Sequence, residues 1–384
     1  MSAPQLFQST DPNAPGGITY NAGTLVAMLD ACLVNGYSTF SVTSITRGGS
    51  TATVTATSHG LVTGETVRIA GAAQTEYNVD AVITKIDANT FTYAVGGTPA
   101  TPATGTITGR KAPAGGGWTI AYTGTNKRAY RAPSGNRFFL RIDDTAAATI
   151  DARLRGYETM SDIDTGTGPF PTDAQNSGGG YAYRTDASTA RGWKVLADSR
   201  AVWWWTDGAG GLGSTSQVNG FGDFISYKVG DAYNSFLACG AGTAAGTAYW
   251  IGFTGSPPST TYNGLVLTRN FSQAGGSVIA APLWNEMLSS STFGQNAWIT
   301  VGPTYAIFPE PINGGLLIDR AVLFETVSKG LRGYLPGLWA SYPSRPFSHG
   351  DSFNGTGTYA GKQFMQWNVN GPTSVLMELT DWWL

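Results

Sequence analysis

Residues 38–72 constrain the fold more than any other stretch, because Thr and Ser alternate there with Val, Ile and Ala. The run STFSVTSITRGGSTATVTATSHGLVTGETVRIAGA places an apolar side chain at about every second position, which is the period of a half-buried strand. Gly48 and Gly49 separate the first two runs and suit a tight hairpin turn. The pattern therefore predicts antiparallel strands.

Two further runs in 77–97 and a Pro- and Thr-rich strand that follows them extend this texture to residue 112. A segment of about 75 residues is long enough for a small domain. The glycine-rich stretch 112–117 predicts a flexible linker back to the aromatic-rich texture of the N-terminal residues. We therefore expect 38–112 to be an inserted small β-barrel or Ig-like module, and 1–37 with 113–384 to form one discontinuous body.

The stretch TLVAMLDACLVNG, residues 24–36, carries the one helix that we expect. Leu25, Met28, Leu29, Cys32 and Leu33 follow the spacing of a helical stripe, and an Asn-Gly pair ends it. The rest of the body contains short β-branched and aromatic runs separated by turn residues. The predicted fold class is mainly β: an antiparallel, sandwich-like body with one N-terminal helix, plus the inserted all-β module.

Charge is scarce in this chain. Charged residues make up 12% of its 384 residues and the formal net charge is −2, whereas soluble domains usually contain about 25% charged residues. Lys and Arg form no basic stripe, so we expect no nucleic-acid partner. A charge-poor surface together with 12 Trp, 17 Tyr and 17 Phe favours self-association, because aromatic residues are enriched at interface cores.

The beginning of the chain, MSAPQLFQSTDPNAPGG, has neither a basic segment nor an apolar segment of the kind found in signal peptides. No window approaches 18 uninterrupted apolar residues, so we expect no membrane span. Cys32 and Cys239 lie in apolar surroundings and are expected to be buried thiols rather than a disulfide. Together these features predict synthesis in a reducing cytoplasm.

The loop SDIDTGTGPFPT, residues 161–172, places Asp162 and Asp164 two positions apart before a glycine-rich turn. Many calcium loops begin this way, but an EF-hand needs a further oxygen ligand, a Gly and a final Glu at fixed positions. Counted from Asp162, those positions hold Gly166, Thr167 and Asp173. We favour an Asx-type turn with no cofactor, and keep a Ca2+ site at Asp162 and Asp164 as the alternative.

Catalytic motifs are weak in this sequence. A glycosidase needs two carboxylates across a cleft, and the candidate acids have no diagnostic neighbourhood; they are Asp143, Asp144, Glu158, Glu286, Glu325 and Glu378. His59 and His349 fall in different predicted domains without cysteine neighbours, so they form no zinc set. No G-x-S-x-G motif is present. We expect a protein that is not an enzyme.

Tryptophans carry the strongest functional signal. Trp203, Trp204 and Trp205 are consecutive in an expected strand, so both faces of that sheet must accept an indole. One face is core; the other could stack on sugar rings, but packing by a neighbouring subunit or sheet is favoured because charge is scarce. The chain ends in Trp382, Trp383 and Leu384, whereas termini are usually polar and frayed unless they are docked. These two segments are the predicted interface with other chains.

Several segments resemble a family of tailed-bacteriophage virion structural proteins. They are LVAMLDACLVNGY, GWTIAYTGTNKRAYRA, GNRFFLRIDDT, ARLRGYETMSDIDTGTGPFPT and RGWKVLADSRAVWW. This likeness covers the body, residues 18–37 and 115–384. The run TATSHGLVTGETVRIAGA with YNVDAVITKIDANTFTYAV is similar to small β modules embedded in phage structural and tail-tip proteins. The resemblance implies a virion component and brings no catalytic residues with it.

The resemblance and the composition lead to the same expectation. The chain is predicted to be a non-enzymatic component on the exterior of a tailed-phage virion, assembled in the host cytoplasm. Its partners would be copies of itself and other virion proteins. We expect a tail, baseplate or fibre-attachment position, with a capsid decoration protein as the first alternative. A module that binds host surface glycan, or a depolymerase, is the second alternative.

Overall fold

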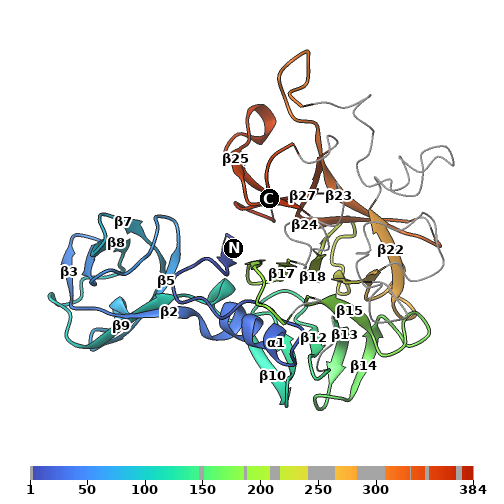
Figure 1. The fold of residues 1–384 in the computed structure, drawn as a ribbon, viewed down its shortest axis with the longest axis horizontal. Coiled ribbons are helices and arrows are strands. Elements are labelled where there is room, and N and C mark those ends of the chain that lie inside the picture. The colour runs from blue at the N-terminus through green and yellow to red at the C-terminus, as the bar shows by residue number, and fades with distance from the viewer. Residues whose placement is uncertain are drawn as a thin grey trace.

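The computed structural model describes most of the chain. The described residues are 3–146, 151–185, 188–207, 217–240, 264–282, 308–328, 330–341, 346–368 and 374–383. Strands account for 47% of the structure and helices for 7%, and the sheets are large and antiparallel. The predicted fold class, a mainly β protein with a sandwich-like body and one N-terminal helix, is confirmed (Figure 1).

The alternating stretch after Ser38 forms two antiparallel four-stranded sheets, which lie to the left of the body in Figure 1. One sheet contains β2 (Tyr37–Ser41), β9 (Gly105–Lys111), β5 (Thr66–Ala72) and β6 (Asp80–Val82). The other contains β3 (Ser44–Gly48), β4 (Thr51–Thr55), β8 (Thr90–Ala94) and β7 (Thr84–Lys85). A short 3-10 turn, η2 (Thr75–Tyr77), lies between β5 and β6. The buried apolar residues of both sheets form one cluster, because the period-two pattern turns them all inward.

The junction between this module and the body is packed rather than loose. Lys111 is 5% exposed, and its Nζ lies 2.6 Å from Asp11 Oδ2 and 2.9 Å from Glu65 Oε1. The predicted flexible linker at 112–117 is wrong, since Ala112 and Ala114 are fully buried and Ala114 begins the 3-10 turn η3 (Ala114–Gly116). A side chain at Gly115 would meet the backbone of the turn at residues 198–199 within 2.7 Å, so the glycine is needed for close approach.

The helix lies in the core of the body, where its uncharged faces are covered. α1 (Thr24–Leu29) continues without a break into η1 (Asp30–Asn35), a π-helical turn, and together they match the predicted helix 24–36. Asp144 Oδ2 accepts the N–H groups of Leu25 and Val26, at 2.9 and 3.3 Å. This carboxylate therefore binds backbone donors that a helix start otherwise leaves unpaired.

A six-stranded antiparallel sheet packs beside the helix. Its strands are β10 (Thr119–Gly124), β11 (Lys127–Arg131), β12 (Phe139–Asp143), β13 (Asp151–Met160), β14 (Gly166–Phe170) and β15 (Gly180–Tyr183). The strands follow one another along the chain as hairpins, except that β14 and β15 both pair with β13. Its inward side chains share one apolar cluster with the helix and with the next sheet.

The remaining strands form a 13-stranded antiparallel sheet. Its first part contains β1 (Gln5–Gln8), β16 (Trp193–Ala197), β17 (Ala201–Thr206), β18 (Gln217–Asp223), β20 (Ser235–Ala238), β21 (Leu265–Leu267) and β22 (Val278–Pro282). Its second part contains β23 (Ile318–Glu325), β24 (Leu331–Ser341), β27 (Ser374–Glu378), β26 (Gln363–Asn368) and β25 (Ser352–Asn354), with β19 (Ile225–Ser226) paired to β24. A 3-10 turn, η4 (Gly357–Tyr359), joins β25 to β26.

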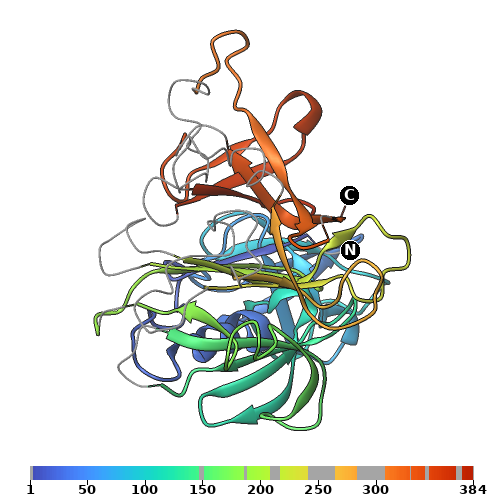
Figure 2. The same cartoon turned by 90° about the vertical axis from the view of Figure 1, so that its right-hand side faces the viewer.

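The long sheet bends so that its second part covers its first. Figure 2 shows three layers, with the C-terminal strands above, the strands around β17 and β18 in the middle, and the six-stranded sheet with α1 below. Alternate side chains of β17 belong to two different apolar clusters, one on each face. The middle layer is thus covered on both sides by the same chain. Among the described residues, no helix is long and apolar enough to cross a membrane.

Candidate functional site

The tryptophan run lies in the middle layer, on β17. Trp204 faces the helix side, whereas Trp203 and Trp205 face the C-terminal layer, and none is more than 2% exposed. Trp203 Nε1 donates to the carbonyl of Pro336 at 2.9 Å, and Trp205 Nε1 donates to that of Asn368 at 2.7 Å. The prediction that these indoles contact another chain is therefore corrected. Trp203 and Trp205 pack on the C-terminal layer of the same chain, and Trp204 packs on its helix side.

The C-terminal tryptophans also dock on their own chain. Trp382 is 2% exposed, and its Nε1 donates to the carbonyl of Glu378 at 2.7 Å. Trp383 is half-buried, and its Nε1 donates to Asp198 Oδ2. Burial raises the pKa of Asp198. A docked terminus was expected, but the docking surface belongs to the protomer itself, and Leu384 lies outside the described residues.

The loop at 161–172 is held by local contacts. Asp162 Oδ1 accepts the N–H of Asp164 at 2.9 Å, which is the Asx-type turn that the sequence favoured. Asp164 Oδ1 lies 2.8 Å from Lys127 Nζ and also contacts Arg141. Hydrogen bonds from these two cations lower the pKa of Asp164. A Ca2+ ion at Asp162 and Asp164 stays a prediction, and it would compete with two cations for one carboxylate.

The other candidate acids form ion pairs within the fold. The pairs are Asp144 with Arg184, Glu158 with Arg269, and Glu325 with Arg332, at 2.6 to 2.8 Å. Asp143 lies 3.1 Å from the guanidinium of Arg141 and 3.5 Å from Lys127 Nζ. Except for Arg141–Asp143, which lies within β12, each contact joins segments that are separate in the sequence or connects the two strands of a hairpin. Glu286 lies outside the described residues.

The histidines and cysteines pack in the interior of the fold. Cys32 and Cys239 are free, buried thiols, as expected, and burial raises the pKa of Cys32. His59 is 4% exposed, and its Nδ1 accepts the N–H of Leu61 at 3.0 Å. His349 packs against the indole of Trp205 with ring centroids 4.1 Å apart. Within the described ranges, no three His, Cys, Asp or Glu side chains lie close enough to hold a metal ion.

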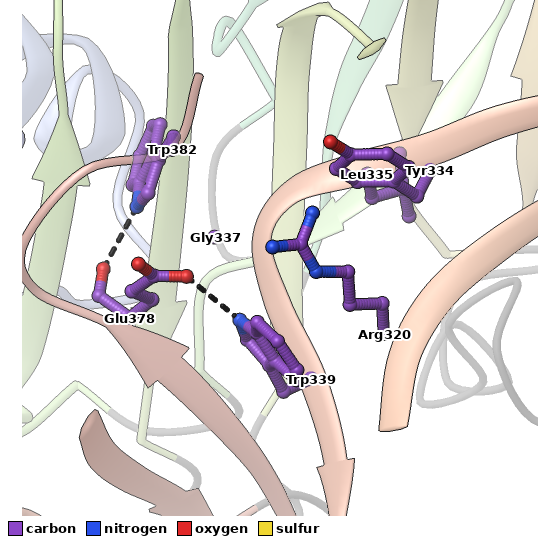
Figure 3. Close-up of a pocket in the computed structure, with 7 residues that line it drawn as sticks. All are labelled: Arg320, Tyr334, Leu335, Gly337, Trp339, Glu378 and Trp382. Atoms are coloured by element: carbon purple, nitrogen blue, oxygen red, sulfur yellow. Dashed lines mark hydrogen bonds between the residues drawn. The ribbon is translucent and has the colours of Figure 1, made fainter. Parts of the chain in front are cut away.

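A small hollow in the C-terminal layer combines a cation, a carboxylate and aromatic rings (Figure 3). It encloses about 190 Å3 that no atom fills, including open solvent at its mouth, and its inner part is narrow. The strands β23, β24 and β27 and the C-terminal segment supply its walls. The lining residues are Arg320, Tyr334, Leu335, Gly337, Trp339, Glu378 and Trp382. We call this hollow the Arg320 pocket.

Arg320 occupies one side of the pocket between two rings. Its guanidinium carbon lies 4.6 Å from the centroid of Tyr334 and 4.9 Å from that of Trp339. Both distances are within the range of a cation–π contact. Figure 3 shows the guanidinium directed into the hollow, toward the side where Glu378 lies.

Glu378 occupies the opposite side, and its carboxylate is already engaged. Oε2 accepts the indole N–H of Trp339 at 3.0 Å. Oε1 accepts the Lys362 ammonium and the Thr380 hydroxyl, the latter at 3.2 Å. Glu378 is 2% exposed, so these three donors compensate a buried charge that would otherwise be costly.

Gly337 shapes the floor of the pocket. Its φ of 68° lies in the left-handed region, and a Cβ there would stand 2.2 Å from Trp382 Nε1. Glycine therefore lets the C-terminal indole lie directly on β24. Trp382 is the one predicted interface residue that reaches this pocket, and it forms part of its wall.

Sequence reasoning did not select Arg320 or Tyr334. Arg320 lies in LLIDRAVLFE, and this cation in a mostly apolar strand is the signal that the sequence offers. The rings that flank it come from 14 and 19 positions further along the chain, on the next strand. Glu378 was noted only as an acid on an expected strand, and its partners could not be inferred from spacing.

Comparisons with known proteins give no relative for this chain: no protein-family model matches it and no curated protein sequence matches it.

Proposed function

We propose that this chain is a non-enzymatic structural component on the exterior of a tailed-phage particle, in the tail, baseplate or fibre attachment. The resemblance of several segments to phage virion proteins supports a location on a phage particle. The observation that carries the structural role is the junction at Lys111. A module joined through a buried cation, two carboxylates and a packed glycine turn has one orientation on its body. Fixed orientation is what an assembled particle requires of a displayed module.

The acids support a non-enzymatic role for a related reason. Glu158 binds Arg269 through both carboxylate oxygens, at 2.7 and 2.6 Å. This bidentate pair joins β13 to the turn after β21, so its removal would loosen the body. Glu325 Oε1 pairs with Arg332 at 2.7 Å across the β23–β24 hairpin. A depolymerase would need two of its carboxylates to face a glycosidic bond instead.

The surface that we propose for self-association differs from the tryptophan segments predicted from the sequence. Four apolar side chains are well exposed near the β19–β24 edge: Val229 at 98%, Phe271 at 53%, Val327 at 73% and Leu331 at 54%. Lys228 Nζ donates to the carbonyl of Phe271 at 3.3 Å, which ties two of these segments together. Grouped apolar residues at a surface favour contact with another protein.

Immunogold electron microscopy of intact particles, with antibodies against the full-length chain, tests this function. We expect mass spectrometry to find the protein in purified particles and the gold to lie on the tail. Gold on the shell would contradict the tail position and support a capsid decoration protein. Absence of the protein from particles would overturn the proposal. Release of reducing ends from host polysaccharide, abolished in Glu158→Gln, would overturn the non-enzymatic part.

A further inference from the structure

No carboxylate among the described residues pairs with the guanidinium of Arg320. Its guanidinium contacts two aromatic rings, and among the described residues it donates no hydrogen bond and forms no ion pair. Glu378 faces Arg320 across the pocket, but its carboxylate pairs with Lys362 and forms no ion pair with Arg320. Asp319, its neighbour in sequence, accepts the backbone N–H of Arg320 at 2.7 Å.

The two rings fix the guanidinium but cannot satisfy its N–H groups. A cation–π contact uses the face of an aromatic ring and provides no acceptor in the plane of the guanidinium. The planar fork of an arginine matches the two oxygens of a carboxylate. Since the fork points into the pocket, an incoming carboxylate could bind both of its arms (Figure 3).

The charge around the pocket also favours an anion. Among the charged side chains that line the pocket or pair with its lining, Arg320 and Lys362 are cations and Glu378 is an anion, while the Asp319 carboxylate next to Arg320 in the chain has partners of its own. Lys362 and Glu378 neutralise each other, so the guanidinium is left to attract a negative group. Because Arg320 is only half-buried, such a group can reach it from solvent.

The shape of the pocket limits what can carry this negative group. The inner part has room for about one water-sized group, so a carboxylate must reach Arg320 from the mouth and any larger group stays outside. Tyr334 lines the pocket and is half-buried, and its ring lies 6.3 Å from that of Tyr227, which is 55% exposed and lies outside the lining. The C–H face of a pyranose ring is apolar and packs on such exposed aromatic rings.

We propose that the Arg320 pocket binds an acidic sugar, with Arg320 holding its carboxylate and Tyr334 with Tyr227 supporting the sugar ring. Glu378 and Lys362 position the wall through Trp339 and stay paired to each other. This inference concerns the isolated chain and does not depend on its place in a virion.

Calorimetric titration of the full-length protein tests the proposal with defined probes. The acidic probes are trigalacturonate, a hyaluronan tetrasaccharide and sialyllactose. The fully methyl-esterified trigalacturonate and maltotriose are neutral controls, and a glutamate-rich peptide is the control for carboxylates of protein. We expect at least one acidic sugar to bind, its neutral counterparts to fail, and the peptide to bind no better than they do.

The variant Arg320→Gln should weaken acidic-sugar binding by about 10- to 100-fold, because hydrogen bonds to charged groups contribute on that scale. Arg131→Gln is the matched control. Arg131 also stacks on a ring, at 4.7 Å from the centroid of Phe139, but lines no part of the pocket. It should bind like the parent protein. Should Arg320→Gln misfold, Arg320→Lys keeps the charge without the fork and is expected to weaken binding as well.

Four results would overturn the proposal. They are no binding of any acidic probe, equal binding of the methyl ester, tighter binding of the peptide than of the sugars, and unchanged affinity in both Arg320 variants.

Discussion

Lys111 and Arg320 are two cations in similar aromatic surroundings that differ in whether a carboxylate pairs with them. Lys111 Nζ lies 5.3 and 5.9 Å from the ring centroids of Phe7 and Tyr37, as Arg320 lies near Tyr334 and Trp339. Lys111 also has two carboxylates, whereas Arg320 has none among the described residues. The matched cation holds the molecule together, and the unmatched one is available to a ligand. Charge compensation, rather than aromatic content, therefore separates a structural joint from a candidate binding site.

The largest effect is expected at the matched cation. Lys111→Met would leave Asp11 and Glu65 without their cation in a nearly closed junction, and breaking such a pair should lower the free energy of unfolding by about 3 kcal/mol. Urea denaturation followed by circular dichroism measures this. Lys85→Met, in the same module, is the control, since Lys85 is exposed and its change should be neutral within about 0.5 kcal/mol. Equal unfolding free energies for Lys111→Met and Lys85→Met would show that the ion pairs of Lys111 do not stabilise the junction.

Glu378→Gln tests the Arg320 pocket. The variant loses the ion pair with Lys362 while keeping an acceptor for Trp339, so we expect a loss of about 1 to 2 kcal/mol in unfolding free energy. It also removes the negative charge across from Arg320, which should raise acidic-sugar affinity about two- to fivefold. Calorimetric titration of the variant checks the second effect. A lower affinity would contradict the expectation that Glu378 only repels the acidic sugar.

The tryptophans of β17 repeat the contrast between matched and unmatched groups. Trp203 Nε1 has a carbonyl partner, whereas Trp204 Nε1 is buried with none among the described residues. Trp203→Phe should therefore cost about 1 kcal/mol more stability than Trp204→Phe, because only the first change abandons a hydrogen bond. Paired urea denaturation curves measure the difference. The opposite order would show that the indole of Trp204 has a partner in solution.

Local pattern was sufficient for much of the fold. Period-two alternation located the strands of the module, and the stripe from Leu25 to Leu33 located the helix, because both depend on neighbours in sequence. The tryptophan run showed that both faces of β17 are buried, but not by what. The layer that covers Trp203 comes from residues more than 130 positions away. The Arg320 pocket likewise depends on a strand register that no local pattern encodes.

The smallest effect is expected at a surface carboxylate. Asp164 is matched by Lys127 and Arg141, but its side chain is 53% exposed, so Asp164→Asn should cost less than about 1 kcal/mol at neutral pH. The pKa of Asp164 is lowered in the folded protein, so its contribution is present above the unfolded pKa of about 4 and is lost as pH falls through the lower folded value. The difference in unfolding free energy between parent and variant should be larger at pH 7 than at pH 2. A larger difference at pH 2 would contradict this sign.

Arginine side-chain NMR tests the central claim most directly. In a titration of the 15N-arginine-labelled protein with the tightest-binding acidic sugar, the Nε–Hε resonance that is absent from Arg320→Gln should shift, and the resonance absent from Arg131→Gln should stay in place. A titration that moves other arginine resonances and leaves that of Arg320 unchanged would contradict the account.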